Sequence, residues 1–332
     1  MTSREPRVFD VLEPMKCLQL GDYGRVYVQG ELLQRNSKVL TRGVFKAQSG
    51  TESLVLKRAA AKRFFDTSSK LEAECAGSPR LRLHVDRNAQ EEALIYPYYE
   101  STLLVFTKDN PELHYLQRKK ILRHVAEGIR ELHSRHWAHL DIKPDNVFLN
   151  TSEVQGTKEV ANAALGDFDI AFKLEDGQVL SAPGPVGNPM WRSPEAQVGC
   201  GLTMASDIFS FGLVCLYAMG AGDMLIIDPK VLEFLGMSPE EEVLSRHVEY
   251  FGPASDVLYK RIGNETGRAF LKKTINASTV PYETDPERRL THWGQDLGPV
   301  ALDIIGRMTS MDPPARPTIT EILEHAWWRE EN

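Results

Sequence analysis

The pattern of apolar and polar positions divides the chain into a strand-rich first part and a helix-rich remainder. Short apolar runs between glycines and polar turns predict strands over about the first hundred residues, with one helix at about 61–76. From Thr102 onward the apolar spacing becomes helical. In the clearest helix, residues 115–135, the apolar positions fall close to one face: Leu116, Ile121, Leu122, Val125, Ile129 and Leu132. The pattern predicts an α+β protein.

The most apolar stretch, residues 208–222, approaches the composition of a membrane-spanning helix. It is too short to cross a bilayer comfortably, and Asp207 and Asp223 bound it. We therefore predict a buried core helix. The first residues, MTSREPR, lead into no apolar signal core, which predicts a protein of the cytoplasm or the nucleus with no membrane span.

The composition adds several exclusions. With 332 residues, 42% of them hydrophobic and 26% charged, the chain can bury a sizeable core. The net charge of −7, without a long basic run, argues against binding nucleic acid or anionic membranes through bulk charge. No C-x-x-C pair occurs, so neither a zinc site nor a disulfide framework is indicated, and a reducing compartment is expected. The four cysteines are scattered: Cys17, Cys75, Cys200 and Cys215.

Two short polar stretches carry the candidate chemistry: HLDIKPDN at 139–146 and DFD at 167–169. Together they supply carboxylates, an amide and an ammonium group. These groups suit phosphoryl transfer, in which an Asp orients the attacking hydroxyl and accepts its proton. An Asp and an Asn can act as oxygen ligands for hard cations, and a Lys can offset charge on the transferred group.

The first stretch closely resembles the catalytic loop of protein kinases, H-R-D-x-K-x-x-N, and the second resembles their D-F-G. Further motifs occur in the order that a kinase requires. They are a glycine turn at 18–28, a V-A-I-K-like strand at 54–57, an A-P-E-like segment at 190–195, a D-x-W-S-x-G-like segment at 207–212 and a late arginine at 315–318. Within the family, the chain resembles divergent fungal serine/threonine-type kinases with Y-P-Y hinges and D-I-F-S-F-G helices. The resemblance implies one protein kinase domain over 1–332, with a small β-rich N-lobe at about 1–99 and a larger, mainly helical C-lobe at 100–332.

The resemblance also implies the reaction, the transfer of the γ-phosphoryl group of ATP to Ser/Thr hydroxyls of protein substrates, with Mg²⁺ as cofactor. No nucleic-acid or membrane partner is implied, and the oligomeric state is left open. The roles carried over are a base and hydroxyl-orienting group at Asp141, magnesium ligands at Asn146 and Asp167, a cation for the α- and β-phosphates at Lys57 and a cation for the γ-phosphoryl at Lys143. Lysine at the last position is the serine/threonine-type marker.

The nucleotide-binding residues follow from the same resemblance. Aligned on Val26, the chain keeps the second and third glycines of G-x-G-x-x-G-x-V as Gly21 and Gly24, with Gln19 at the first. Glycines there let backbone N–H groups approach phosphate oxygens, although a plain β-turn fits the same letters. In the hinge, Pro97 would offer its carbonyl to adenine and Tyr99 its N–H.

Two features near Lys57 remain to be placed. Its acidic partner on the following helix is open between Asp66 and Glu72, with Glu74 as a third candidate. About thirty residues separate the glycine turn from the lysine, which is more than is usual in kinases. We interpret residues 35–52 as an insertion that lengthens the strands.

Several departures from the kinase pattern bear on activity. Leu140 replaces the arginine that grips a phosphorylated activation segment, and Ser181 is the only hydroxyl or phenol between residues 170 and 192. We therefore predict activity that does not wait on phosphorylation there. Asp169 replaces the glycine of D-F-G, which restricts the backbone and adds a carboxylate near the metal. Asn188, where such kinases mostly have threonine, is predicted to hydrogen-bond Asp141.

Histidines recur at His133, His136 and His139. We predict that His139 packs beneath the catalytic loop and holds its backbone, rather than binding a metal.

Two alternative functions remain. A pseudokinase would keep the fold and act as a scaffold, and divergent D-F-G and glycine motifs are its usual marks. A kinase-like enzyme acting on small molecules is a third class, but such enzymes commonly lack a counterpart of the Glu195–Arg316 pairing and of the 207–212 helix.

Overall fold

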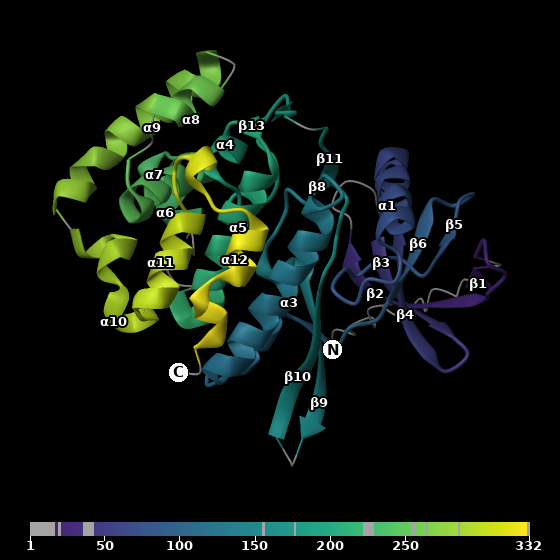
Figure 1. Cartoon of the computed structure of the whole chain (residues 1–332). Coiled ribbons are helices and arrows are strands. Elements are labelled where there is room, and N and C mark those ends of the chain that lie inside the picture. Colours follow the sequence, from purple (N-terminus) through teal and green to yellow (C-terminus); the bar gives the residue numbers. More distant parts are fainter. Residues whose placement is uncertain are drawn as a thin grey trace, which may run out of the picture. The chain divides into compact units, whose positions relative to one another are not determined.

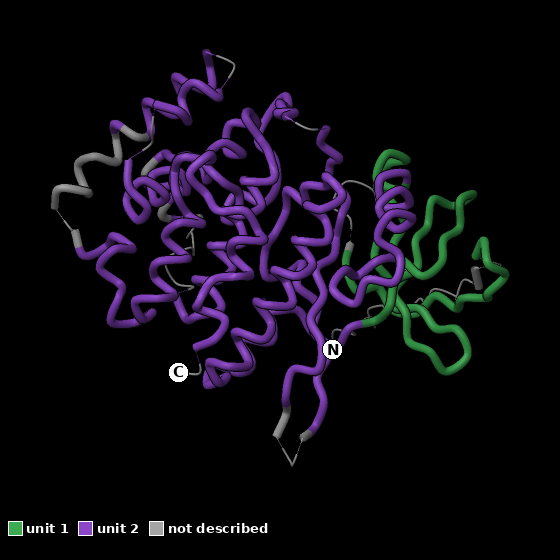
Figure 2. The backbone as a smooth tube through the Cα atoms, viewed as in Figure 1, with its two compact units in different colours: residues 1–65, 84–98 green, residues 66–83, 99–332 purple. Residues whose placement is uncertain are grey.

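The computed structural model describes residues 17–18, 21–35, 43–154, 157–175, 177–221, 229–253, 256–262, 265–284 and 286–330. The chain forms two compact units (Figure 2). The first contains residues 1–65 and 84–98, and the second contains residues 66–83 and 99–332.

The first unit is built on one antiparallel sheet with strand order β1-β2-β3-β4-β6-β5. Its strands are β1 (Cys17–Leu18), β2 (Tyr27–Arg35), β3 (Gly43–Ser49), β4 (Glu52–Arg58), β5 (Asp86–Asn88) and β6 (Ala93–Pro97). Strand alternation explains its two apolar faces. Along β4, Leu54 and Leu56 pack with Tyr27 on one face, while Val55 packs with Tyr96 on the other.

The register of this sheet corrects one prediction from the sequence. Residues 43–49 are a complete strand that pairs with β2 on one side and β4 on the other, with Val44 opposite Lys57. The interpretation of residues 35–52 as an insertion that only lengthens neighbouring strands is therefore wrong. The strand was hidden because β3 and β4 are separated by the two-residue turn Gly50–Thr51, which the sequence reading did not recognise.

The second unit is mainly helical (Figure 1). Helix α1 (Lys62–Cys75) begins in the first unit and continues in the second. The other helices are α2 (Leu103–Asp109), α3 (Tyr115–His133), α4 (Pro194–Gln197), α5 (Met204–Leu216), α6 (Pro229–Leu235), α7 (Pro239–Phe251), α8 (Asp256–Arg261), α9 (Glu265–Thr284), α10 (Gly294–Leu297), α11 (Pro299–Met308) and α12 (Ile319–Glu324). Short 3₁₀ helices lie at Pro144–Asn146, Pro286–Arg288, Leu290–His292, Pro313–Ala315 and Ala326–Arg329, and a π-helical turn at Tyr217–Ala221.

Three small antiparallel sheets complete this unit. The largest has the order β10-β9-β7, formed by β7 (Ser101–Thr102), β9 (Val147–Val154) and β10 (Thr157–Leu165). In Figure 1, β9 and β10 form a long hairpin beside α3, on which β10 packs. Strands β8 (Trp137–Ala138) and β11 (Phe172–Lys173) pair with each other, as do β12 (Leu180–Ser181) and β13 (Cys200–Leu202).

Helix α3 confirms the helical pattern read at 115–135. Its stripe of apolar residues from Ile121 to Leu132 is fully buried, but Leu116 is 43% exposed because it lies in the first turn.

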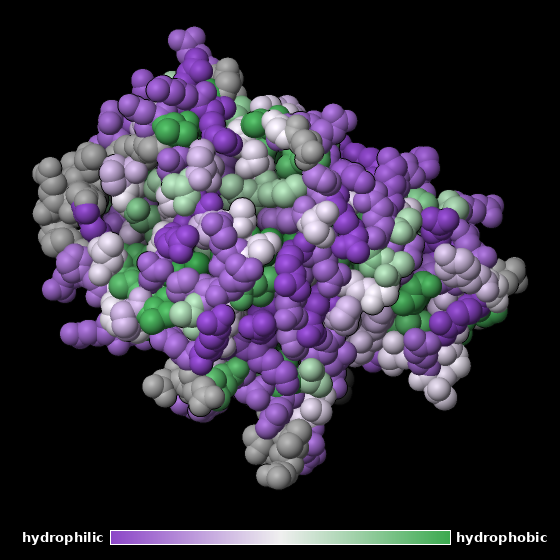
Figure 3. Space-filling view, viewed as in Figure 1, coloured by the Kyte–Doolittle hydropathy of each residue, from purple (hydrophilic) through white to green (hydrophobic). Residues whose placement is uncertain are grey.

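Helix α5 is the apolar segment of the sequence. The window Met204–Ala221 is long and apolar enough to cross a membrane by length and composition, but 67% of it is buried inside the unit. Every residue of α5 from Ser206 to Leu216 is buried, so the predicted core helix is confirmed. On the face shown in Figure 3, hydrophobic residues are scattered among hydrophilic ones.

The last described turns are held by a buried lysine. Lys119 of α3 is only 5% exposed, and its ammonium donates to the main-chain oxygens of Trp327 and Glu330, the latter at 2.6 Å. The rings of Tyr115 and Trp327 lie 5.2 and 5.8 Å from the ammonium nitrogen. Burial lowers the pKa of Lys119.

Candidate active site

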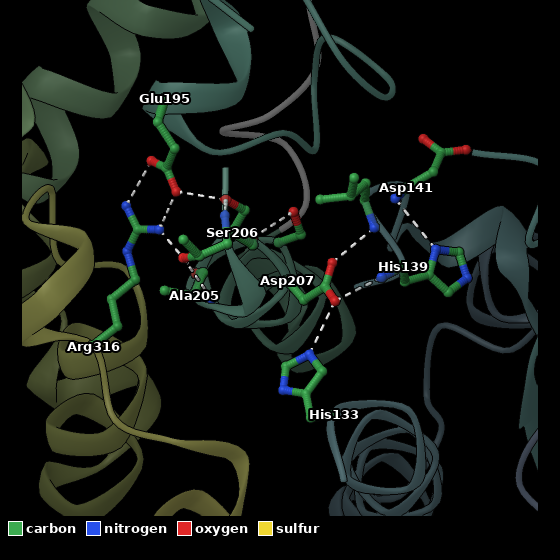
Figure 4. A network of polar contacts seen from close by, with 11 residues as sticks. His133, His139, Asp141, Glu195, Ala205, Ser206, Asp207 and Arg316 are labelled. Atoms are coloured by element: carbon green, nitrogen blue, oxygen red, sulfur yellow. Dashed lines mark hydrogen bonds and ion pairs between the residues drawn. The ribbon is translucent and has the colours of Figure 1, made fainter. Parts of the chain in front are cut away.

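The carboxylate of Asp207, in the first turn of α5, holds the loop between β8 and β9 through hydrogen bonds to its main chain (Figure 4). Its Oδ2 accepts from the main-chain N–H of His139 at 2.8 Å and lies 3.0 Å from His133 Nε2, while its Oδ1 accepts from the N–H of Leu140 at 2.8 Å. Leu140 has a φ of 63°, a conformation that side chains other than glycine rarely adopt. Asp207, 1% exposed, stabilises that strained turn through the two backbone bonds.

His139 supports the same loop from within, as predicted. Its ring is fully buried and lies 5.1 Å from the ring of Phe168, centroid to centroid. Nε2 lies 3.1 Å from the carbonyl oxygen of Gly166, which can only accept, so the proton is on Nε2 and Nδ1 accepts from the N–H of Asp141 at 3.2 Å. Among the described residues no cluster of three or more His, Cys, Asp or Glu side chains could hold a metal ion.

The loop brings three of the predicted catalytic and metal-binding side chains together. Lys143 Nζ donates to Asp141 Oδ2 at 2.6 Å, and Asn146 Nδ2 donates to the same oxygen at 3.1 Å and to the main-chain oxygen of Asp141 at 2.9 Å. These partners fix the carboxylate of Asp141 in one orientation. It remains 13% exposed, so a substrate hydroxyl can still reach it.

Asp167 follows the end of β10 and has a φ of 65°. The preceding residue, Gly166, donates its N–H to the main-chain oxygen of Asn146 at 2.9 Å, so the two predicted metal-binding positions lie on directly bonded segments. Because Asn146 uses its amide nitrogen on Asp141, its oxygen is left as a possible ligand. One amide and one carboxylate oxygen suit Mg²⁺, which usually takes few protein ligands and completes its shell with water and phosphate oxygens.

The segment leading away from the site is anchored against the loop. Gly187 has a φ of 88°, and a Cβ added there would lie 2.5 Å from the carbonyl oxygen of Leu140. The next residue, Asn188, donates its main-chain N–H to Asp141 Oδ1 at 2.9 Å. The predicted hydrogen bond between Asn188 and Asp141 is thus confirmed, but it comes from the main chain: the side-chain Oδ1 of Asn188 accepts instead from the N–H of Met190 at 3.0 Å.

A buried ion pair fixes the far end of that segment (Figure 4). Glu195 and Arg316 are joined by two hydrogen bonds of 2.6 and 3.0 Å, and both side chains are fully buried. Ser206 donates to Glu195 Oε1 at 2.8 Å, and Arg316 Nη1 donates to the carbonyl of Ala205 at 2.9 Å. Burial acts to raise the pKa of Glu195, but the guanidinium outweighs it and holds that pKa below its usual value. The pairing expected from the sequence is confirmed.

One candidate partner of Lys57 is used elsewhere. Glu74 accepts from Lys173 Nζ at 2.7 and 2.8 Å and from the indole of Trp137 at 2.9 Å, which lowers its pKa. The acidic partner of Lys57 remains open between Asp66 and Glu72.

The glycine turn is the clearest disagreement with the sequence reading. A Cβ at Gly21 would lie 2.0 Å from Asp86 Oδ2, so the carboxylate of β5 packs directly against the turn. Asp86 is fully buried and accepts from the N–H of Tyr23 at 3.4 Å and from the hydroxyl of Tyr27 at 2.7 Å. A carboxylate therefore lies against the turn at Gly21, and its negative charge would oppose the approach of a phosphate there.

The strand order gives a second reason. The 21–26 turn joins β1 and β2, whereas the hairpin next to β4, the strand that carries Lys57, is formed by β2 and β3. These two observations argue against the predicted assignment of Gly21, Gly24 and Val26 to phosphate binding. Gln19 lies outside the described residues.

The remaining predicted nucleotide-binding residues are placed within their own units. Lys57 lies on β4 opposite Leu94 of β6, and Pro97 is the last residue of β6. Tyr99 belongs to the second unit, where its ring lies 6.0 Å from the ring of Phe148.

The sequence indicated Asp207 only as the start of a motif and did not indicate Gly187, so the contacts of both residues with the loop were not predicted. Asp207 stands at the start of the 207–212 motif, which was the available signal. No sequence signal indicates the Gly187 contact, because it depends on how two distant segments meet.

The chain is similar in sequence to known proteins. Residues 84–328 match the protein kinase domain family. The chain is 26% identical to mitogen-activated protein kinase 17 of Arabidopsis thaliana over 71% of its own length and 44% of the relative's. It is 25% identical to serine/threonine-protein kinase/endoribonuclease IRE2 of Homo sapiens over 66% and 19%. It is 24% identical to serine/threonine-protein kinase dst3 of Dictyostelium discoideum over 60% of its own length and 26% of the relative's. The chain thus spans less than half the length of each of these relatives.

Proposed function

The chain belongs to the protein kinase family, and from this premise we propose that it transfers the γ-phosphoryl group of ATP to serine and threonine hydroxyls of protein substrates. The observation that carries the proposal is the bonded set of Asp141, Lys143 and Asn146, joined through Gly166 to Asp167. This set contains every side chain of the second unit that we expect to take a direct part in phosphoryl transfer.

The contacts of these residues support the following roles. Asp141 accepts the proton of the attacking hydroxyl and orients its oxygen toward the phosphorus, and its Oδ1 bond to Asn188 keeps it aimed. The ammonium of Lys143, 2.6 Å from Asp141, offsets negative charge that develops on the transferred group.

Asn146 and Asp167 would hold Mg²⁺, which bridges phosphate oxygens and neutralises their charge when bound. Lys57 of the first unit serves the α- and β-phosphates. The carbonyl of Pro97 in the first unit and the N–H of Tyr99 in the second serve adenine.

The phosphate-covering role passes from the 21–26 turn to the connection between β2 and β3. This connection ends at Gly43, and the next residue, Val44, is the register partner of Lys57. It therefore returns to the sheet beside the lysine that contacts the phosphates. Residues 36–42 of the connection lie outside the described residues.

The test is the rate of phosphate transfer to a generic protein substrate by wild type and Asp141→Asn. Removing a positioned general base should lower kcat about 10²- to 10⁴-fold, with ATP affinity and thermal unfolding unchanged. Phosphoamino acid analysis of the product should show phosphoserine or phosphothreonine.

Two results would contradict the proposal. If wild type and Asp141→Asn are equally inactive while both bind ATP, the chain is a scaffold. If phosphate is transferred to a small molecule but to no protein or peptide, the enzyme belongs to the small-molecule class.

A further inference from the structure

A cavity of about 540 Å³ lies beside the anchored segment of the second unit, between α4 and the first turns of α7 and α9. Helices α4 and α7 lie next to one another there (Figure 1). Its apolar wall is formed by Ala182, Pro183, Pro185, Val198 and Phe270. A space of this size accepts a long side chain or a small ligand.

The position of the cavity relates it to the acceptor hydroxyl. Pro185, in its wall, precedes Gly187 by two residues, and a Cβ at Gly187 would lie 3.5 Å from Asp141 Oδ1. Two residues of chain span at most about 7 Å. A peptide with its hydroxyl at Asp141 therefore has neighbouring side chains within reach of the cavity.

Besides the hydroxyls of Ser238 and Thr266, the cavity is lined by two side chains with acceptor oxygens, Gln197 and Glu240. Gln197 is 2% exposed, and its Nε2 donates to the carbonyl of Pro189 at 2.7 Å. That carbonyl can only accept, so the amide nitrogen must face it and the amide is not flipped. Oε1 is then buried with no hydrogen-bond partner in the described part of the chain. A buried acceptor left unpaired is costly and calls for a donor.

Glu240 supplies the charge. Its Oε1 lies 3.5 Å from Nη2 of Arg192, a buried side chain that holds the carboxylate in place. Its other oxygen has no partner among the described residues. Glu240 begins a run of three glutamates in the first turn of α7, of which Glu241 pairs with Lys273 and Glu242 with Arg246.

We propose that this cavity is a subsite for a lysine or arginine side chain of the protein substrate, lying within a few residues of the acceptor hydroxyl. The apolar wall suits the methylene stem of such a side chain, whose charged end would donate to Glu240 and to Oε1 of Gln197. This inference rests on the proposed function, because it assumes that the site receives a peptide.

The experiment uses a set of serine peptides in which lysine is placed at each position on either side of the acceptor, one position per peptide. Each is matched by a peptide with norleucine, which keeps a four-carbon side chain without the charge. The measured quantity is the ratio of kcat/KM between the two. One position should give a ratio of about tenfold or more, the size expected for a charge-assisted hydrogen bond.

Variants assign the ratio to the cavity. Glu240→Gln and Gln197→Met should each bring it close to one. Glu242→Gln, which removes a neighbouring charge engaged with Arg246, should leave it unchanged. Each ratio compares two peptides on the same enzyme variant, so a general loss of activity in that variant cancels. This matters because Glu240→Gln removes the counter-ion of buried Arg192.

A binding measurement separates failure of the subsite from failure of the proposed function. Fluorescence anisotropy is read with peptides in which alanine replaces the acceptor serine. If no peptide is phosphorylated but the lysine peptide still binds more tightly than its norleucine match, and Glu240→Gln removes the difference, the subsite stands and the proposed activity falls. A flat ratio at every position, a ratio unchanged in both cavity variants, or a preference for acidic side chains would overturn the subsite.

Discussion

Asp141 Oδ1 accepts the main-chain N–H of Asn188 at 2.9 Å, so the segment that follows β12 is bonded directly to the proposed base. The contact needs no particular side chain at position 188. It needs the segment to pass close to the loop, which Gly187 allows by lacking a Cβ.

Gly187→Ala should therefore lower kcat strongly. An alanine there would be strained at a φ of 88° by about 1–2 kcal/mol, and its Cβ would meet the carbonyl oxygen of Leu140 at 2.5 Å. The segment must then shift, which breaks the bond to Asp141. Steady-state kinetics measures the loss. Gly184→Ala is the matched control, because a Cβ at Gly184 meets nothing within 4 Å, and equal effects of the two variants would contradict the argument.

Activity should not depend on phosphorylation of Ser181. The segment around it is held by main-chain bonds, from Ala182 N–H to the oxygen of Gly199 at 2.7 Å and from Val186 N–H to the oxygen of Ala196 at 3.0 Å. Phosphatase treatment and Ser181→Ala should each leave kcat/KM within about twofold of the untreated enzyme, since exposed substitutions change little. Abolition of activity by phosphatase, and its recovery on phosphorylating Ser181, would refute this prediction.

The free energy of unfolding should fall as the pH is lowered below about 6.5, partly because of His247. Its ring is buried against Phe209 and Phe251, and neither ring nitrogen has a hydrogen-bond partner among the residues that the structure describes. Burial lowers its pKa from 6.5 to about 3. In the unfolded chain the ring takes up a proton near pH 6.5, whereas in the folded protein it stays neutral until about pH 3. Protonation therefore favours the unfolded state between these values, and the stabilisation is complete only above pH 6.5.

Denaturant unfolding of wild type and His247→Leu at several pH values checks this. Between pH 6 and 4 the variant should lose about 1.4 kcal/mol less per pH unit than wild type. Burial lowers the pKa of His84 and His124 to about 4, so a residual slope remains in the variant. Parallel curves for the two proteins would show that His247 is not the source.

The part of the site that could be predicted from the sequence is the part whose geometry is local. Asp141, Lys143 and Asn146 lie within six residues of chain, and their spacing alone places their side chains near one another. The core helix could be predicted equally well, because from Ile208 to Leu216 every residue except Ser210 is apolar or glycine.

The rest depends on contacts between distant residues. Asp86 lies more than sixty residues from Gly21 in the sequence, and nothing in its residue type indicates that it packs against the glycine turn. The bond from Asn188 to Asp141 comes from the main chain and so leaves no mark in the sequence. At position 188 the contact was predicted from the residue type, but the main-chain N–H makes it. At the glycine turn the decisive residue, Asp86, was not predicted at all.

Lys119 sets a practical limit on shortened versions of this protein. Its ammonium donates to the carbonyl oxygens of Trp327 and Glu330, which belong to the last residues that the structure describes. An expression product terminated before Trp327 would leave a positive charge inside the second unit with neither acceptor, and would be expected to yield poorly however complete its catalytic loop.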